Sequence, residues 1–125
     1  MDDIDPKLVV RKFNQSINNR DIEGLANLIS DDHIFIDSSG EVHRGKERMT
    51  AGWSDFFSQY PDYRNHFSVV ESRKNLVLVI GHSTCSHKPL DGPALWTARV
   101  ENGLVAEWRV YFDTPENREK LNLPS

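Results

Sequence analysis

The sequence predicts an α+β fold in which helices precede a mostly antiparallel sheet. Residues 6–60 carry three helical patterns with one short strand among them, whereas residues 64–113 alternate between apolar and polar side chains as strands do. Asn102 and Gly103 stand between two such alternating runs, and an Asn-Gly pair in that setting is the strongest short signal for a β-hairpin. Helices that are segregated from an antiparallel sheet define the α+β class.

Length and charge restrict the classes of protein that the chain can belong to. Its 125 residues are about the size of one domain, so we expect a single domain over residues 1–125. The net charge of −4 is opposite to the basic balance that nucleic-acid binding requires. Residues 76–80 form the longest apolar run, which is too short for a membrane span. The acidic N-terminus has no secretory signal pattern, and the single Cys85 has no internal disulfide partner, so we expect a cytoplasmic protein.

The helices are predicted from local signals. Asp5 is suited to cap the first helix, and Pro6 to occupy its first position, where a missing N–H costs nothing. Asp21 is suited to cap a second, short helix, whose apolar stripe we expect to reach Ile29. Residues 46–60 place their apolar side chains on one helical face, and a following proline ends this third helix.

The remaining segments are predicted as strands and connections. The predicted strands are 33–37, 64–72, 76–87, 95–101 and 104–113. The predicted connections are a turn at 30–32, a short connector at 41–45, a loop at 89–93 and a terminal helix or tail from Thr114. The last three strands should lie side by side, because consecutive strands usually pair.

Four segments in a fixed order form a recognisable pattern. They are NNRDIEGL at 18–25, ID with a Gly-containing turn and RG at 36–45, YPDY at 60–63, and NGLVAEWRVYFD at 102–113. Together they resemble the SnoaL-like and ketosteroid-isomerase-like branch of the NTF2-like superfamily. The resemblance implies a curved sheet wrapped against three N-terminal helices, which together form a cone with an open mouth. It also implies a small-molecule-binding protein, often a homodimer through the outer sheet face.

The pattern of the strands also favours a homodimer. Residues 76–80 are apolar at every position, so both faces of that strand must be covered, and a second subunit is the simplest cover for the outer one. On the last strand, Trp108, Val110 and Phe112 share one face, while the opposite face is polar and bears an Arg and a Tyr. Such a face suits a dimer interface, and the alternative is a solvated sheet surface.

Asp37 is the leading candidate for a catalytic group. It ends the first strand on the same face as Phe35, and by the resemblance it matches the general base of the ketosteroid isomerases. A carboxylate in an apolar hollow has a raised pKa, which suits proton abstraction. This implies isomerase-, cyclase- or lyase-type proton transfer on a hydrophobic carbonyl compound. The alternative is a structural role, because Asp-Ser-Ser-Gly is also favourable turn chemistry.

Several positions depart from the family's catalytic patterns. Phe13 stands where the isomerases have a Tyr, and Trp96 or Thr97 stands where they have a protonated Asp. Losing one oxyanion donor costs about 100- to 1000-fold in rate, so steroid isomerisation is not expected. Val110 stands where the epoxide hydrolases and polyketide cyclases have an acid two residues after Trp108. These departures favour the alternative of a non-catalytic dimeric module that binds a ligand or a protein.

The histidines leave open alternatives. His82 is predicted either to point into the cone as an acid or base, or to lie on the outer face at an interface. His66 is predicted either to line the pocket or to be an ordinary half-buried histidine. Cys85 and His87 share one strand face, but a packed thiol is the preferred interpretation, so we expect neither a metal nor a cofactor.

Aromatic side chains supply the predicted binding surface. Small-molecule sites are mostly apolar with a few polar groups, here Asp37 with His82 or His66. Asp37 and His82 are the predicted catalytic residues. The residues predicted to bind the ligand are Phe13, Phe35, Trp53, Phe57, Tyr60, His66, Trp96, Trp108, Val110 and Phe112.

Overall fold

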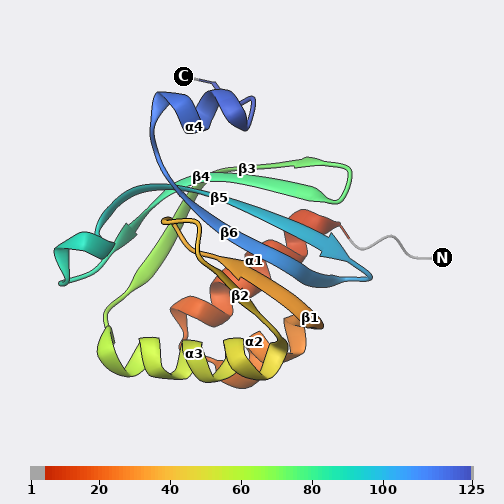
Figure 1. Cartoon of the computed structure of the whole chain (residues 1–125), viewed down its shortest axis with the longest axis vertical. Helices are drawn as coiled ribbons and strands as arrows, with labels where there is room; N and C mark the ends of the chain where they lie inside the picture. Colours follow the sequence, from red (N-terminus) through yellow and green to blue (C-terminus); the bar gives the residue numbers. More distant parts are fainter. Residues whose placement is uncertain (1–4, 125) are drawn as a thin grey trace.

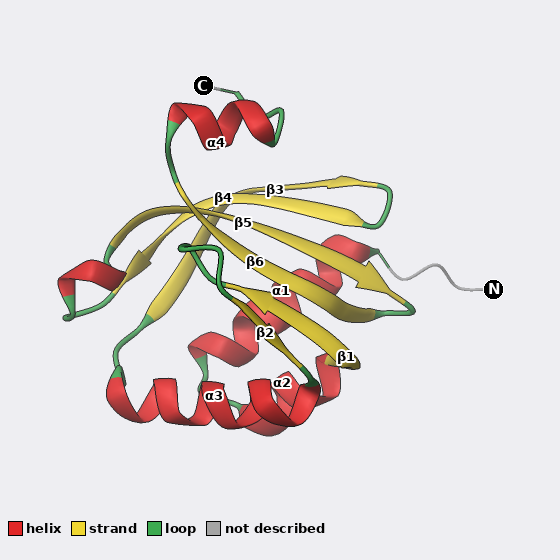
Figure 2. Cartoon of the chain, in the orientation of Figure 1, coloured by secondary structure: helices red, strands yellow, loops and turns green. Residues whose placement is uncertain are grey.

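The computed structural model describes residues 5–124 and forms a curved sheet with helices on both sides (Figures 1 and 2). The helices are α1 (Pro6–Asn18), α2 (Ile22–Leu28), α3 (Lys46–Gln59) and α4 (Pro115–Lys120), with a 3-10 turn at Lys88–Leu90. The strands are β1 (Ile29–Ile36), β2 (Val42–Arg44), β3 (Arg64–Arg73), β4 (Leu76–Thr84), β5 (Gly92–Glu101) and β6 (Leu104–Phe112). None of the helices in the described part of the chain is long and apolar enough to cross a membrane.

The six strands form one sheet in the order β2-β1-β6-β5-β4-β3. All neighbouring strands are antiparallel except β1 and β6, which run parallel. The expected pairing of the last three strands is confirmed. Asn102 and Gly103 both have positive φ, at 53° and 76°, as the tight turn between β5 and β6 requires.

The concave face of the sheet is covered unevenly by the first three helices. α1 crosses the sheet and packs against β3, β4, β5 and β6, whereas α3 packs mainly against β1 and β2 at one edge. The core beneath α1 is closed: Val10, Phe13 and Ile17 have no exposed surface. Between α3 and the strands β5 and β6, the concave face is not filled by a helix.

The local helix signals are confirmed, and one boundary is corrected. Asp5 and Asp21 cap α1 and α2 through their carboxylates, at 3.0 Å from the N–H of Lys7 and 2.9 Å from that of Gly24. Ile29, predicted to extend the helical stripe, instead begins β1 and is buried. The predicted turn at 30–32 is also wrong, because these polar residues belong to β1, which pairs with β6 through an irregular register.

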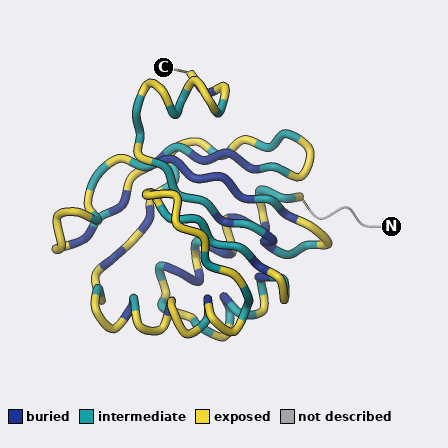
Figure 3. Tube along the Cα trace, viewed as in Figure 1, coloured by how far each residue is buried: buried dark blue, intermediate teal, exposed yellow. Residues whose placement is uncertain are grey.

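The convex face of the sheet is partly covered by the chain's own C-terminus. α4 lies on the side opposite to the other helices, and burial is greatest along the central strands (Figure 3). Leu123, which follows α4, packs with Leu78 of β4 and Leu95 of β5 in a second apolar cluster. The predicted apolar face of β4 therefore has a partial cover within the same chain, so the apolar pattern of this strand does not by itself require a second subunit.

Candidate functional site

A cavity of about 540 Å³ opens between α3 and the concave face of the sheet. Its position follows from the uneven helix cover, because α1 fills one half of that face and α3 stands at the edge of the other. Six aromatic side chains line it: Phe35, Trp53, Phe56, Tyr63, Trp96 and Trp108. The remaining lining residues are Asp37, Ser38, His43, Arg48, Met49, Ala51, Gly52, Asp55, Leu90 and Val110.

The cavity has an apolar interior and a polar mouth. Trp96 and Trp108 are each 1% exposed, and their rings stack with centroids 6.3 Å apart. Trp53 is also buried and meets Phe35 and Phe56 edge-on at 6.2 and 5.7 Å. By contrast, the charged lining residues are half-buried or exposed. This arrangement is typical of a site for a small molecule.

Asp37 lies at the mouth, in the turn that joins β1 to β2. Its Oδ1 accepts hydrogen bonds from the backbone N–H of Ser39 at 3.0 Å, the hydroxyl of Ser39 at 2.6 Å and the N–H of Glu41 at 3.0 Å. The backbone of Asp37 also closes the turn with Gly40 and Glu41. Asp37 therefore has the position that both interpretations of the sequence require: one of its oxygens stabilises the turn, and its side chain also borders the cavity.

The expected rise in the pKa of Asp37 is wrong. Burial does raise the pKa of this carboxyl, but the hydrogen bonds that it accepts from Ser39, Glu41 and His43 outweigh burial and hold the pKa below its ordinary value. The carboxyl is only partly desolvated, because 32% of the side chain is exposed. Asp37 is thus a stable anion at neutral pH.

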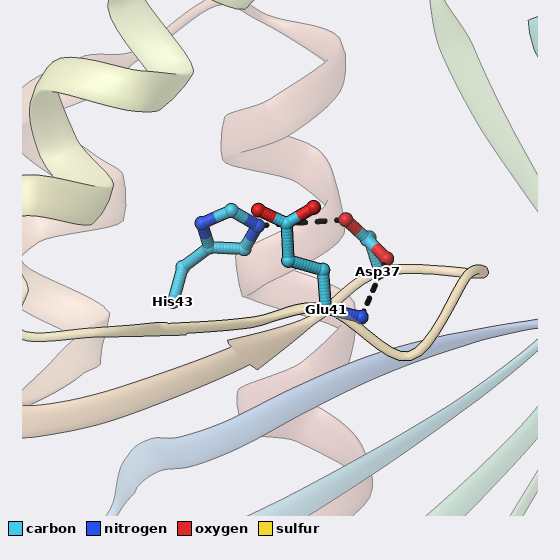
Figure 4. A group of neighbouring side chains, drawn as sticks. All are labelled: Asp37, Glu41 and His43. Atoms are coloured by element: carbon cyan, nitrogen blue, oxygen red, sulfur yellow. Dashed lines mark hydrogen bonds and ion pairs between the residues drawn. The ribbon is translucent and has the colours of Figure 1, made fainter.

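His43 is the polar neighbour of Asp37 that the sequence analysis missed. Its Nε2 lies 3.4 Å from Oδ2 of Asp37, and its ring centroid is 5.8 Å from that of Phe35 (Figure 4). His43 reaches this position because it belongs to the three-residue strand β2. This strand pairs His43 directly with Phe35, so both side chains lie on the concave face. The sequence pattern of residues 41–45 predicts a short connector with at most one bridging pair, and such a segment has no face that could be assigned.

Among the described residues, Asp37, Glu41 and His43 form one group that offers metal-ligand atoms within 4.8 Å of one another (Figure 4). Two carboxylates and an imidazole suit a divalent ion such as Zn²⁺. Oδ2 of Asp37 is the oxygen left for such a bond, since Oδ1 is used by the turn. Glu41 is exposed, and exposed acidic side chains commonly gather without a metal.

The structure brings six of the predicted site residues together. Asp37, Phe35, Trp53, Trp96, Trp108 and Val110 all line the cavity. The four that lie on β1, β5 and β6 are turned to the concave face by the alternation of these strands. Trp53 reaches the cavity from α3, and Asp37 from the turn between β1 and β2. Trp96 contributes a polar atom as well, because its Nε1 is buried and has no hydrogen-bond partner among the described residues.

Two predicted histidines lie on the opposite side of the sheet. His66 and His82 are paired across β3 and β4, and their exposed rings stack with centroids 4.7 Å apart. His82 follows Leu78 and Ile80 on the convex face, which excludes it from the cavity wall. His66 is held there by Thr84, whose Oγ1 lies 3.1 Å from its Nε2.

The other four predicted binding residues also lie outside the cavity wall. Phe13 is fully buried on the sheet-facing side of α1, with its ring 4.9 Å from that of Trp108. Phe57 and Tyr60 pack at the end of α3, against Trp53 and His87 respectively. Phe112 ends β6 and is 59% exposed. Their shared apolar character therefore does not distinguish cavity wall from packed core or surface.

The sequence and the structure of the chain are similar to those of known proteins. The family model of the SnoaL-like domain matches residues 10–108. A LEH-like epoxide hydrolase from M. tuberculosis is 18% identical with a TM-score of 0.76, over 86% of this chain and 82% of that one. A proposed SnoaL-like polyketide cyclase from Shewanella putrefaciens is 16% identical with a TM-score of 0.75, over 97% and 98% of the two chains.

An uncharacterized cystatin-fold protein from Novosphingobium aromaticivorans has a TM-score of 0.77 at 17% identity, over 88% of this chain and 100% of that one. At such identities these structures show the fold alone. No curated protein matches the sequence. The family match covers most of the chain and agrees with the NTF2-like cone described above. The chain belongs to the family of SnoaL-like domains.

Proposed function

We propose that this protein binds a small, mainly apolar molecule in the cavity between α3 and the sheet. The observation that carries this proposal is a space of about 540 Å³ with six aromatic side chains in its wall and its charged groups at the mouth. This volume is in the range of small-molecule sites, roughly 300–1,000 Å³. The similar epoxide hydrolase and proposed polyketide cyclase are named for reactions on small organic molecules, which also favours a ligand of this kind.

The test is whether a compound occupies the cavity when the protein is purified. A Cβ at Gly52 meets no atom within 4 Å, and Val110 faces the cavity from β6, so Gly52→Phe together with Val110→Phe adds a ring from each wall. We expect mass spectrometry of an organic extract to find a compound with the natural chain but not with this filled variant. Equal amounts in both extracts would place the compound elsewhere on the protein.

A second candidate function is proton transfer by Asp37 on a bound carbonyl compound. The observation that favours it is a carboxylate at the mouth of an apolar cavity with an imidazole 3.4 Å away. Hydrogen-isotope exchange at the α-carbon of an apolar ketone should then slow strongly in Asp37→Asn, where the amide cannot accept the proton. Equal exchange rates in the natural chain and in Asp37→Asn would contradict proton transfer by Asp37 and would favour the non-catalytic alternative, in which the cavity only binds a ligand.

We also propose that the protein forms a homodimer through the convex face of the sheet. The cover provided by α4 leaves Val42 of β2 and Val69 of β3 exposed on that face, at 43% and 44%. Sedimentation equilibrium should give twice the mass of 14.4 kDa, and Val69→Lys should shift the protein toward the monomer. A monomer at all concentrations would contradict this proposal.

A further inference from the structure

The mouth of the cavity combines carboxylates with aromatic rings. Phe35 lies near the end of β1, two residues before Asp37 of the following turn, and Phe56 follows Asp55 on α3. Both rings are half-buried, and both carboxylates line the same cavity. Aromatic faces carry negative electrostatic potential and attract cations, most strongly where the cation is partly desolvated.

Trp53 connects these two groups. Its ring lies 6.2 Å from that of Phe35 and 5.7 Å from that of Phe56, in both cases edge to face. The three rings therefore line one continuous stretch of wall between the turn that bears Asp37 and the helix that bears Asp55. Indole is the aromatic group that binds cations best.

The carboxylates at the mouth are poorly neutralised by the protein. Asp37 has one ion-pair neighbour among the described residues, His43, at 3.4 Å. Asp55 forms no salt bridge with a described residue. Glu41 adds a third carboxylate next to the cavity, since one ligand atom each from Asp37, Glu41 and His43 lie within 4.8 Å of one another. Hydrogen bonds keep the pKa of Asp37 below its ordinary value, so its charge persists through the neutral range.

Of the residues that the structure describes, Arg48 is the one Lys or Arg side chain in the wall of this cavity. Arg109 and Lys120 lie with Asp37 in the wall of a neighbouring hollow. Arg48 stands seven residues before Asp55 on α3. Seven residues correspond to about 10 Å along a helix, too far for a direct ion pair with Asp55. Arg48 therefore reduces the negative potential of the mouth without neutralising either carboxylate by contact.

We propose that the ligand of this cavity is an organic cation: an apolar body that contacts Trp96 and Trp108, with a substituted ammonium group at the mouth between Asp37, Asp55 and the rings around Trp53. This inference rests on the proposed function, since it assigns a chemical class to the ligand of the same cavity. Carboxylates supply the charge, and the aromatic faces replace part of the water that the ammonium group loses.

The experiment compares two probes of one shape, 4-hydroxyphenyltrimethylammonium and 4-tert-butylphenol, which differ only in the charge of the branched group. Isothermal calorimetry should show the cationic probe binding about fivefold to tenfold more tightly than the neutral one. Asp37→Asn and Asp55→Asn should each reduce this ratio. Asn at position 37 retains the oxygen that accepts the hydrogen bonds of the turn, so the variant should fold.

Asp32→Asn is the matched control, because this substitution removes the same charge as the other two. Asp32 is exposed on β1 and is not part of the cavity wall. The probe ratio of this variant should equal that of the natural chain. Equal or tighter binding of 4-tert-butylphenol would overturn the cation proposal while leaving the proposed function in place. If neither probe binds, and if the organic extracts of the natural chain and of the filled variant Gly52→Phe with Val110→Phe contain the same compounds, both proposals fail together.

Discussion

His33 in β1 and Asp37 in the turn after this strand are polar side chains only four residues apart, but their surroundings differ strongly. His33 lies beneath α1 with no exposed surface, and its Nδ1 donates to the carbonyl of Val105 at 2.7 Å. Burial lowers the pKa of His33, although the hydrogen bond to Val105 and the charge of Asp32 oppose this, so the ring is neutral. Asp37 lies at the open end, where hydrogen bonds hold it as an anion.

The difference shows what the uneven helix cover does to one sheet face. Where α1 packs directly on the sheet, only apolar or neutral groups are accommodated, and the interior is filled. Where α3 stands at the edge, a cavity remains and a charge can keep contact with water. The packed half therefore carries stability, and the open half is where we propose that the ligand binds.

The largest difference is expected between aromatic truncations in the two halves. Phe13→Ala removes a fully buried ring from the packed half and should lower the free energy of unfolding by about 4 kcal/mol. Phe56→Ala removes a half-buried ring beside an existing cavity and should cost about 1–2 kcal/mol. Urea unfolding of both variants measures the two values. Equal losses would mean that the halves are packed alike.

His33 should make stability depend on pH. Its pKa is lower in the folded state than the value of about 6.5 expected when unfolded, so only the unfolded chain takes up this proton as the pH falls. The contribution of His33 is therefore complete above about pH 6.5 and is lost below it, with a slope of at most about 1.4 kcal/mol per pH unit. His33→Gln should reduce the slope of the unfolding free energy between about pH 5 and 6.5. His66→Gln, at an exposed site, is the control and should retain the slope.

The hydrogen bonds that Asp37 accepts in the turn and the negative charge of its side chain can be tested separately. Asp37→Ala removes the acceptor of the three hydrogen bonds from Ser39 and Glu41, and should lower the free energy of unfolding by about 1 kcal/mol. Asp37→Asn keeps an acceptor oxygen at the same place and should cost clearly less. Thermal unfolding of the two variants side by side tests this, and a greater loss for Asn would show that the charge, not the hydrogen bonds, holds the turn.

Two glycines offer the smallest and most local comparison. Gly52 is inside α3, and a Cβ there meets no atom within 4 Å, so Gly52→Ala should stabilise the protein by about 0.5–1 kcal/mol through helix propensity. A Cβ at Gly81 would collide with the carbonyl oxygen of His66 on the neighbouring strand, so Gly81→Ala should instead destabilise the protein. Calorimetric melting temperatures decide both signs.

The fold was predictable because much of it depends on local signals. Asp5, Pro6 and Asp21 mark helix starts through contacts within three residues, and Asn102 with Gly103 marks a turn by backbone conformation alone. The segment 29–32 was assigned wrongly because its strand conformation depends on pairing with β6, more than 70 residues away in the sequence. Without knowledge of the pairing with β6, two adjacent aspartates predict a turn.

The candidate site was less predictable, because it depends on which half of the face each side chain occupies. The strand alternation predicts that Phe35 and Asp37 share one face, and that Trp108 and Val110 share one face of the last strand. The structure has all four at the cavity. The alternation could not separate Phe13 from them, since the path of α1 decides which aromatic rings are packed. His43 was missed because the face of a three-residue strand is set only by its pairing with β1.

The most direct test of the cavity as a ligand site uses its own tryptophans. All three tryptophans of the chain, Trp53, Trp96 and Trp108, line the cavity, so their indole N–H signals in a ¹⁵N–¹H spectrum report on it alone. We predict that 4-tert-butylphenol shifts these signals saturably in the natural chain and not in the variant with Gly52→Phe and Val110→Phe. Indole signals that stay unmoved at saturating probe, in a folded natural chain, would contradict the existence of a ligand site between α3 and the sheet.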